Sequence, residues 1–65
     1  MQLFINGEKK ESTALSVAEF VKELGLPPQT LMIEHNGLAL HRSEWPEKNL
    51  RHGDHIEILR VAAGG

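Results

Sequence analysis

The chain has 65 residues, a formal net charge of -2 and no cysteine. This length allows one small domain, which buries about 60% of the surface that its unfolded chain exposes and leaves little room for a cofactor pocket. These properties argue against a self-contained enzyme, a disulfide scaffold, a thiolate metal site and a surface for nucleic acid or membrane. No signal-peptide pattern or membrane-spanning apolar run is visible, so we expect a cytoplasmic monomer.

The N-terminal residues have the pattern of a β-hairpin. Apolar side chains alternate along residues 1–5, which is the period of a half-buried strand. Asn6-Gly7 follows, and this pair favours the type I′ turn that joins antiparallel strands. The return strand, from Glu8 to about Ala14, is polar, which suits the edge of a sheet.

Signals at both ends then predict a helix. Ser16 and Glu19 have the spacing of a capping box. Leu15 precedes the cap, where it can pack on Phe20 as a hydrophobic staple. Gly25 supplies the left-handed residue that ends the helix. The apolar positions between these ends fall on one helical face: Val17, Phe20, Val21 and Leu24.

Three patterns in the second half of the chain predict strands at residues 31–36, 38–41 and 55–61. Asn36-Gly37 predicts a tight turn between the first two of these strands. Trp45 lies in a predicted surface turn and is large enough to cover one end of the core.

The order ββαβββ predicts an α+β fold, in which one main helix packs on one face of a four- to five-stranded sheet. We expect a domain over residues 1–61 and a flexible tail over residues 62–65. The predicted core consists of Met1, Leu3, Ile5, Val17, Phe20, Val21, Leu24, Leu31, Ile33, Leu40, Leu50, Ile56 and Ile58.

The opposite face of the sheet is predicted to carry apolar side chains. If Ile56 and Ile58 point inward, strand alternation directs their neighbours outward. The resulting partner-binding face consists of Phe4, Met32, Leu59 and Val61. The alternative is a scatter of single exposed apolar residues, which is normal for soluble proteins.

The tail, Ala62-Ala63-Gly64-Gly65, has no predicted structural partner. A terminal carboxylate can attack the α-phosphate of ATP and become an acyl adenylate, provided that the tail enters another protein's active site. Residues without a Cβ make a thin thread for a narrow channel. We therefore interpret Gly65 as the modified residue and Ala62, Ala63 and Gly64 as the threading segment; the alternative is a frayed terminus.

The remaining polar residues predict neither a metal site nor a catalytic residue. The four histidines lack a recognisable ligand spacing, and the acidic residues are scattered. Ser16 is better explained as a helix cap than as a nucleophile. His35 has inward parity, and we expect it to be partly buried and hydrogen-bonded near a strand end.

Over essentially its whole length the chain resembles the ThiS family, the ubiquitin-like β-grasp sulfur carriers of thiamine biosynthesis. The most discriminating segment is Arg42-Ser43-Glu44-Trp45. The other matching segments are Asn6-Gly7-Glu8, Leu24-Gly25-Leu26, Glu34-x-Asn36-Gly37, Leu50-x-x-Gly53-Asp54-x-Ile56-Glu57-Ile58 and Gly64-Gly65. The chain departs from the family pattern at three places. His35 stands where an aliphatic residue is usual, and His41 stands where proline is common. Leu38-Ala39 replaces a pair that is usually a polar residue followed by a branched one.

The resemblance implies a β-grasp fold with a mixed sheet and a carrier that binds no cofactor itself. An E1-like adenylyltransferase would adenylate the Gly65 carboxylate with ATP and Mg²⁺. A persulfide donor would then convert it to a thiocarboxylate, whose sulfur passes to a thiazole synthase. Sulfur delivery to molybdopterin or another pathway, or a role as a ubiquitin-like modifier or binding module, remain the alternatives.

Overall fold

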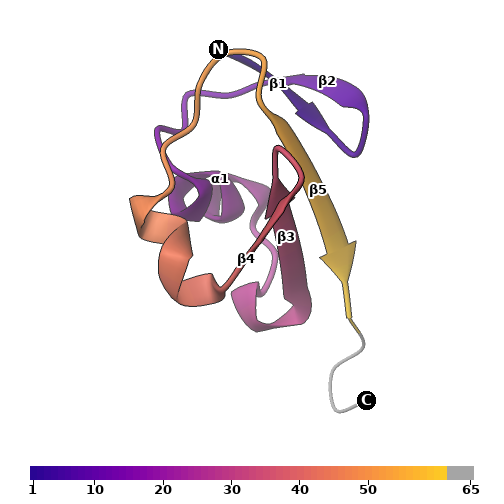
Figure 1. The fold of residues 1–65 in the computed structure, drawn as a ribbon, viewed down its shortest axis with the longest axis vertical. Helices are drawn as coiled ribbons and strands as arrows, with labels where there is room; N and C mark the ends of the chain where they lie inside the picture. The colour runs from indigo at the N-terminus through magenta and orange to yellow at the C-terminus, as the bar shows by residue number, and fades with distance from the viewer. Residues whose placement is uncertain (62–65) are drawn as a thin grey trace.

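The computed structural model describes residues 1–61, within which five strands form one mixed sheet in the order β2-β1-β5-β3-β4 (Figure 1). The central strand β5 pairs parallel with β1 and antiparallel with β3. The elements are β1 Gln2–Ile5, β2 Glu8–Glu11, α1 Val17–Leu24, the short 3-10 helix η1 Pro28–Thr30, β3 Leu31–His35, β4 Leu38–Leu40, the 3-10 helix η2 Arg42–Glu47 and β5 His55–Arg60. The predicted mixed sheet with one main helix is confirmed.

The buried core lies between α1 and the sheet face that carries Leu3, Ile33 and Ile56. Trp45 in η2 is 4% exposed and closes one end of this core, as predicted. The other predicted core residues that are buried are Val17, Phe20, Val21, Leu31 and Leu50, and Ala14 joins them. The remaining predicted ones only border the core and are half-buried: Met1, Ile5, Leu24, Leu40 and Ile58. A sheet covered by a single short helix leaves its margins open to solvent.

Two predictions around the helix start need correction. The strand β2 ends at Glu11, before the predicted Ala14, because the pairing with the N-terminal segment runs out at Ser12, which exchanges backbone hydrogen bonds with Met1 at 2.9 and 2.8 Å. The Ser12 Oγ donates to Glu23 Oε2 at 2.8 Å and so ties the chain after β2 to α1. Leu15 is 66% exposed and forms no staple on Phe20. Its carbonyl accepts from the Leu50 backbone at 3.0 Å, so this segment is held by a backbone bridge instead.

The predicted helix ends are confirmed. Ser16 caps α1 by accepting from the Glu19 backbone N–H at 3.2 Å. Gly25 ends it with a left-handed φ of 70° and donates to the Lys22 carbonyl at 3.1 Å. The segment predicted as a surface turn, Arg42 to Pro46, forms most of the 3-10 helix η2, which ends at Glu47 and packs against α1. None of the helices within residues 1–61 has the length and apolar character needed to cross a membrane.

The first Asn-Gly turn does more than reverse the chain. Asn6 and Gly7 have φ values of 50° and 84°, as a type I′ turn requires. The Asn6 side chain also reaches β5, where Oδ1 accepts from the Ile58 N–H at 2.7 Å and Nδ2 donates to the Ile58 carbonyl at 3.2 Å. This amide continues the β1–β5 pairing beyond the end of β1, and so steadies the half of β5 that leads to the tail.

We therefore expect Asn6→Asp to lower the free energy of unfolding by about 1–2 kcal/mol at pH 7. Aspartate tolerates the left-handed turn conformation, but it places a carboxylate oxygen against the Ile58 carbonyl in place of the Nδ2 donor. The carbonyl raises the pKa of the folded-state carboxyl and protonation restores a donor, so the deficit relative to wild type should shrink as the pH falls from neutral toward the unfolded pKa of about 3.9. Urea unfolding at several pH values measures both effects. The control is Asn49→Asp, at an exposed position outside the turn; equal losses in the two variants would contradict this role of Asn6.

Candidate functional site

The sheet face opposite α1 carries an apolar patch at the tail end of β5. Met32 and Leu59 are directly paired across β3 and β5, and their side chains are 57% and 61% exposed. Val61 follows on the same strand line and is 40% exposed. Its backbone N–H donates to the Thr30 carbonyl at 2.7 Å, which holds the chain in place up to the start of the tail. We call Met32, Leu59 and Val61 the tail-proximal patch.

Phe4 lies on the predicted face but not in this patch. It pairs with His55 in the parallel β1–β5 register, four positions before Leu59, which corresponds to about 13 Å along the strand. The Phe4 and His55 rings stack with their centroids 4.7 Å apart and an interplanar angle of 12°. The four predicted residues thus share a face but form two separate groups, and His55 is the member that the sequence analysis missed. The sequence did contain a signal for it: His55 and Leu59 are four positions apart on one strand, so strand alternation places them on the same face.

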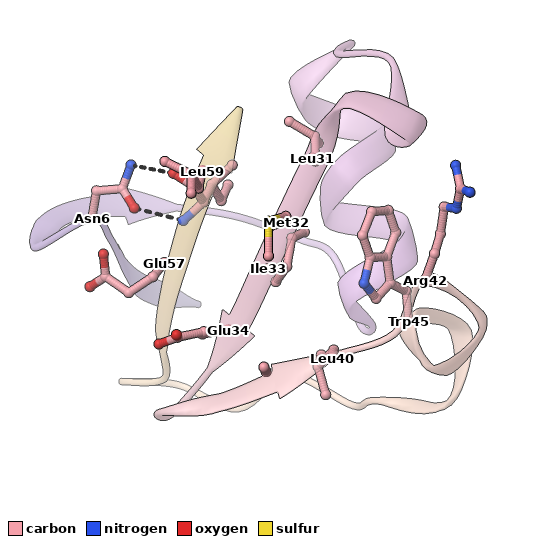
Figure 2. A pocket seen from close by; sticks show the side chains of 12 residues that line it. Asn6, Leu31, Met32, Ile33, Glu34, Leu40, Arg42, Trp45, Glu57 and Leu59 are labelled. Atoms are coloured by element: carbon pink, nitrogen blue, oxygen red, sulfur yellow. Dashed lines mark hydrogen bonds between the residues drawn. The ribbon is translucent and has the colours of Figure 1, made fainter. Parts of the chain in front are cut away.

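A hollow of about 480 Å³ opens beside the tail-proximal patch and extends across β3 and β4 to Trp45 (Figure 2). Met32 and Leu59 line it together with Glu34 and Glu57, and Arg42 lies at its far side. The sheet face is therefore concave at this point, and a concave surface can receive a protruding side chain from another molecule. The Trp45 indole N–H has no hydrogen-bond partner within residues 1–61, so burial of its ring accounts for this residue's position.

A separate polar cluster lies at the other end of β5. His35 Nε2 and Asp54 Oδ2 are 2.7 Å apart, which confirms the expected partly buried, hydrogen-bonded histidine. Asp54 also accepts from the Arg51 backbone N–H at 2.9 Å and from Asn36 Nδ2 at 3.2 Å. Burial acts to raise the pKa of Asp54, but these hydrogen bonds outweigh it and hold the pKa below its ordinary value. This cluster joins the start of β5 to the turn after β3.

The lowered pKa of Asp54 predicts a contribution to acid stability. The folded state holds Asp54 ionised more strongly than the unfolded chain does, so its contribution is present above the unfolded pKa of about 3.9 and is lost as pH falls through the folded value. We expect Asp54→Asn to be less stable than wild type at pH 7, with the difference shrinking below about pH 4. Thermal unfolding across this range measures it; a constant difference at all pH values would show that Asp54 does not act through its charge.

The described residues contain no alternative chemical centre. Within residues 1–61, no three histidine, cysteine or acidic side chains are grouped so that they could hold a metal ion. The Ser16 hydroxyl is occupied in capping α1. The predicted modification residue Gly65 and the threading residues Ala62, Ala63 and Gly64 lie outside the described residues. The four residues predicted as a partner-binding face, Phe4, Met32, Leu59 and Val61, do lie within the described residues.

A model of the ThiS family matches residues 3–65. The chain belongs to the ThiS family. It is similar to the crystal structure of the thiamine biosynthesis protein ThiS from Geobacter metallireducens, with 28% identity, a TM-score of 0.84 and full coverage of both chains. An NMR structure of a Geobacter metallireducens thiamine biosynthesis protein aligns with a TM-score of 0.82 and 28% identity, covering all of this chain and 88% of that one. The β-grasp fold expected from the resemblance is thereby confirmed.

The ThiS-family chain is also similar to part of a larger protein. It is 30% identical over 66 residues to a protein named thiazole synthase from Paramagnetospirillum magneticum. The match covers all of this chain but 20% of that protein. A segment similar to this chain is thus joined there, in one polypeptide, to a much longer remainder.

Proposed function

We propose that this chain is a cytoplasmic sulfur carrier for the thiazole moiety of thiamine and is itself not an enzyme. The observation that carries the proposal is the family match over residues 3–65, which extends through the Gly64-Gly65 end. A chain this small has no enclosed active site of its own in the described residues, so the chemistry belongs to partners that receive the tail.

The proposed reaction begins at the Gly65 carboxylate. An E1-like enzyme binds ATP and Mg²⁺, the carboxylate attacks the α-phosphate, and pyrophosphate leaves. The terminal sulfur of a partner's persulfide then attacks the acyl carbon and displaces AMP. A partner thiol cleaves the resulting S–S bond, which leaves a Gly65 thiocarboxylate and a disulfide on the partner. The carrier needs no cysteine for these steps, and it has none.

The geometry supports this role because the proposed contact with a partner lies on the folded sheet, whereas the proposed reaction takes place at Gly65. β5 is the central strand, held by β1 and β3, and it leads directly to the tail. A partner that docks on the tail-proximal patch therefore receives the tail from a fixed origin. Positioning of this kind lowers the entropic cost of bringing a reacting group into an active site.

We propose a thiazole synthase as the protein that accepts the sulfur. The similarity to part of the Paramagnetospirillum magneticum thiazole synthase supports this choice. Joining a carrier-like segment to its acceptor in one polypeptide raises the effective concentration of one for the other. Such an arrangement is useful only where the two parts meet during the reaction.

An isotope-transfer experiment tests this function. The chain is incubated with an E1-like enzyme, ATP, Mg²⁺ and a persulfide donor carrying labelled sulfur, and the loaded carrier is then supplied to thiazole synthase and its carbon substrates. We expect the label in the thiazole product. Label that reaches only a molybdopterin precursor, or an isopeptide bond between Gly65 and protein lysines, would overturn the proposal in favour of another carrier pathway or a modifier.

A further inference from the structure

Two carboxylates lie directly opposite each other on the sheet face that carries the tail-proximal patch. Glu34 on β3 and Glu57 on β5 are paired in the antiparallel register, and both are exposed. Their position is two residues along each strand from the Met32–Leu59 pair, so the two pairs share one face. Figure 2 shows all four side chains around the same hollow.

The fold does not explain this acidic pair. Like charges directly opposite on neighbouring strands destabilise a sheet. Within residues 1–61 no basic group lies within 4.0 Å of either carboxylate, and Arg42 lines the far side of the same hollow. On the same face, Lys9 lies at the level of Phe4, on the far edge strand β2. A neutral or oppositely charged pair would suit the sheet better, so the carboxylates are unfavourable for the isolated domain.

We propose that Glu34 and Glu57 recognise arginine or lysine side chains of the adenylating partner, beside an apolar contact with Met32 and Leu59. This inference rests on the proposed function and adds the chemistry of the partner surface: an apolar site flanked by cations. Charges of this kind steer association and select the correct partner more than they add affinity. A second copy of this chain is a poor occupant, because pairing through this face would bring two acidic pairs toward each other.

Partner binding and domain stability should therefore respond in opposite directions when the charges are removed. In Glu34→Gln/Glu57→Gln the repulsion disappears, and we expect the Tm to rise by about 2–4 °C. The same variant should raise the KM of the carrier in ATP–pyrophosphate exchange by about tenfold at low salt, with kcat unchanged because the tail is intact. At 0.5 M NaCl this difference should shrink to less than about threefold, because salt screens exposed charges.

The measurement uses the E1-like enzyme that adenylates the wild-type chain. The control variant is Glu8→Gln/Glu47→Gln, which removes the same amount of charge from exposed positions elsewhere on the domain. The control should change neither KM nor its salt dependence.

An unchanged KM in Glu34→Gln/Glu57→Gln overturns the inference while leaving the proposed function intact. A lower Tm would show that the pair serves the fold, and a defect seen only with thiazole synthase would show that the partner was wrongly assigned. A wild-type chain that no E1-like enzyme adenylates overturns the proposed function, and this inference with it.

Discussion

Deletion of Gly65 is expected to reduce sulfur loading by more than about 100-fold without changing the stability of the domain. The deletion leaves a carboxylate on Gly64, but it withdraws the reacting carbon by about 3.5 Å from the position that the partner active site expects. Displacements smaller than this already cost large factors when a reaction depends on orientation. Pyrophosphate release from ATP measures the first step, and thermal unfolding by circular dichroism measures the fold.

The matched control is Ala62→Gly, which alters the tail but keeps its length and its terminal residue. We expect this variant to be loaded within a few-fold of the wild-type rate. Wild-type loading of the Gly65 deletion would contradict the assignment of Gly65 as the reacting residue. A lowered Tm would show instead that the terminus supports the fold.

Leu59→Asp is expected to weaken binding of the adenylating enzyme by about 100-fold while the domain still folds. Leu59 is 61% exposed, so little core packing is lost. The change removes an apolar contact at the centre of the tail-proximal patch and places a third carboxylate beside Glu34 and Glu57. Titration calorimetry with the enzyme gives the affinity, and thermal unfolding gives the stability.

Leu15→Asp provides the control for this variant, because Leu15 is 66% exposed but precedes α1 and is not part of the tail-proximal patch. It should bind like wild type. If both variants lose affinity equally, surface hydrophobicity in general is responsible. Loss of the thermal transition in Leu59→Asp would show that Leu59 is a core residue and that the strand parity is wrong.

The sequence was sufficient for those elements whose causes are local. The Asn-Gly pairs require left-handed backbone and so predict both tight turns, at Asn6-Gly7 and Asn36-Gly37. Alternation along β3 and β5 predicts which side chains face α1. The cap at Ser16 and the end at Gly25 predict the helix bounds. Each of these signals acts within a few residues.

The remainder of the fold depends on contacts between distant parts of the chain. The Ser12–Glu23 hydrogen bond joins the chain after β2 to α1, and neither residue signals the other in sequence. The Asn6 contact with Ile58 spans 52 positions. Parity correctly placed Phe4 on the outer face, but only the β1–β5 register shows that Phe4 lies with His55 and apart from Leu59. Strand alternation predicts on which face of the sheet a side chain lies, whereas its neighbours on that face follow only from the register of the paired strands.

The candidate site divides in the same way. Tail composition suggested the chemistry at Gly65 without any structure, and the resemblance added the sulfur and the thiazole acceptor. Strand alternation indicated which apolar residues point outward, but the pairing of Glu34 with Glu57 followed only from the register of β3 with β5. The relation between apolar and acidic groups on that face is therefore a structural finding.

Intact mass spectrometry shows whether Gly65 of this chain receives sulfur. The chain is incubated with its E1-like enzyme, ATP, Mg²⁺ and a persulfide donor, and the product is fragmented to locate any change. We expect a mass gain equal to the replacement of one oxygen by sulfur, confined to Gly65 and absent without ATP. An unchanged mass, with an enzyme shown to be active on another carrier of the ThiS family, would contradict it.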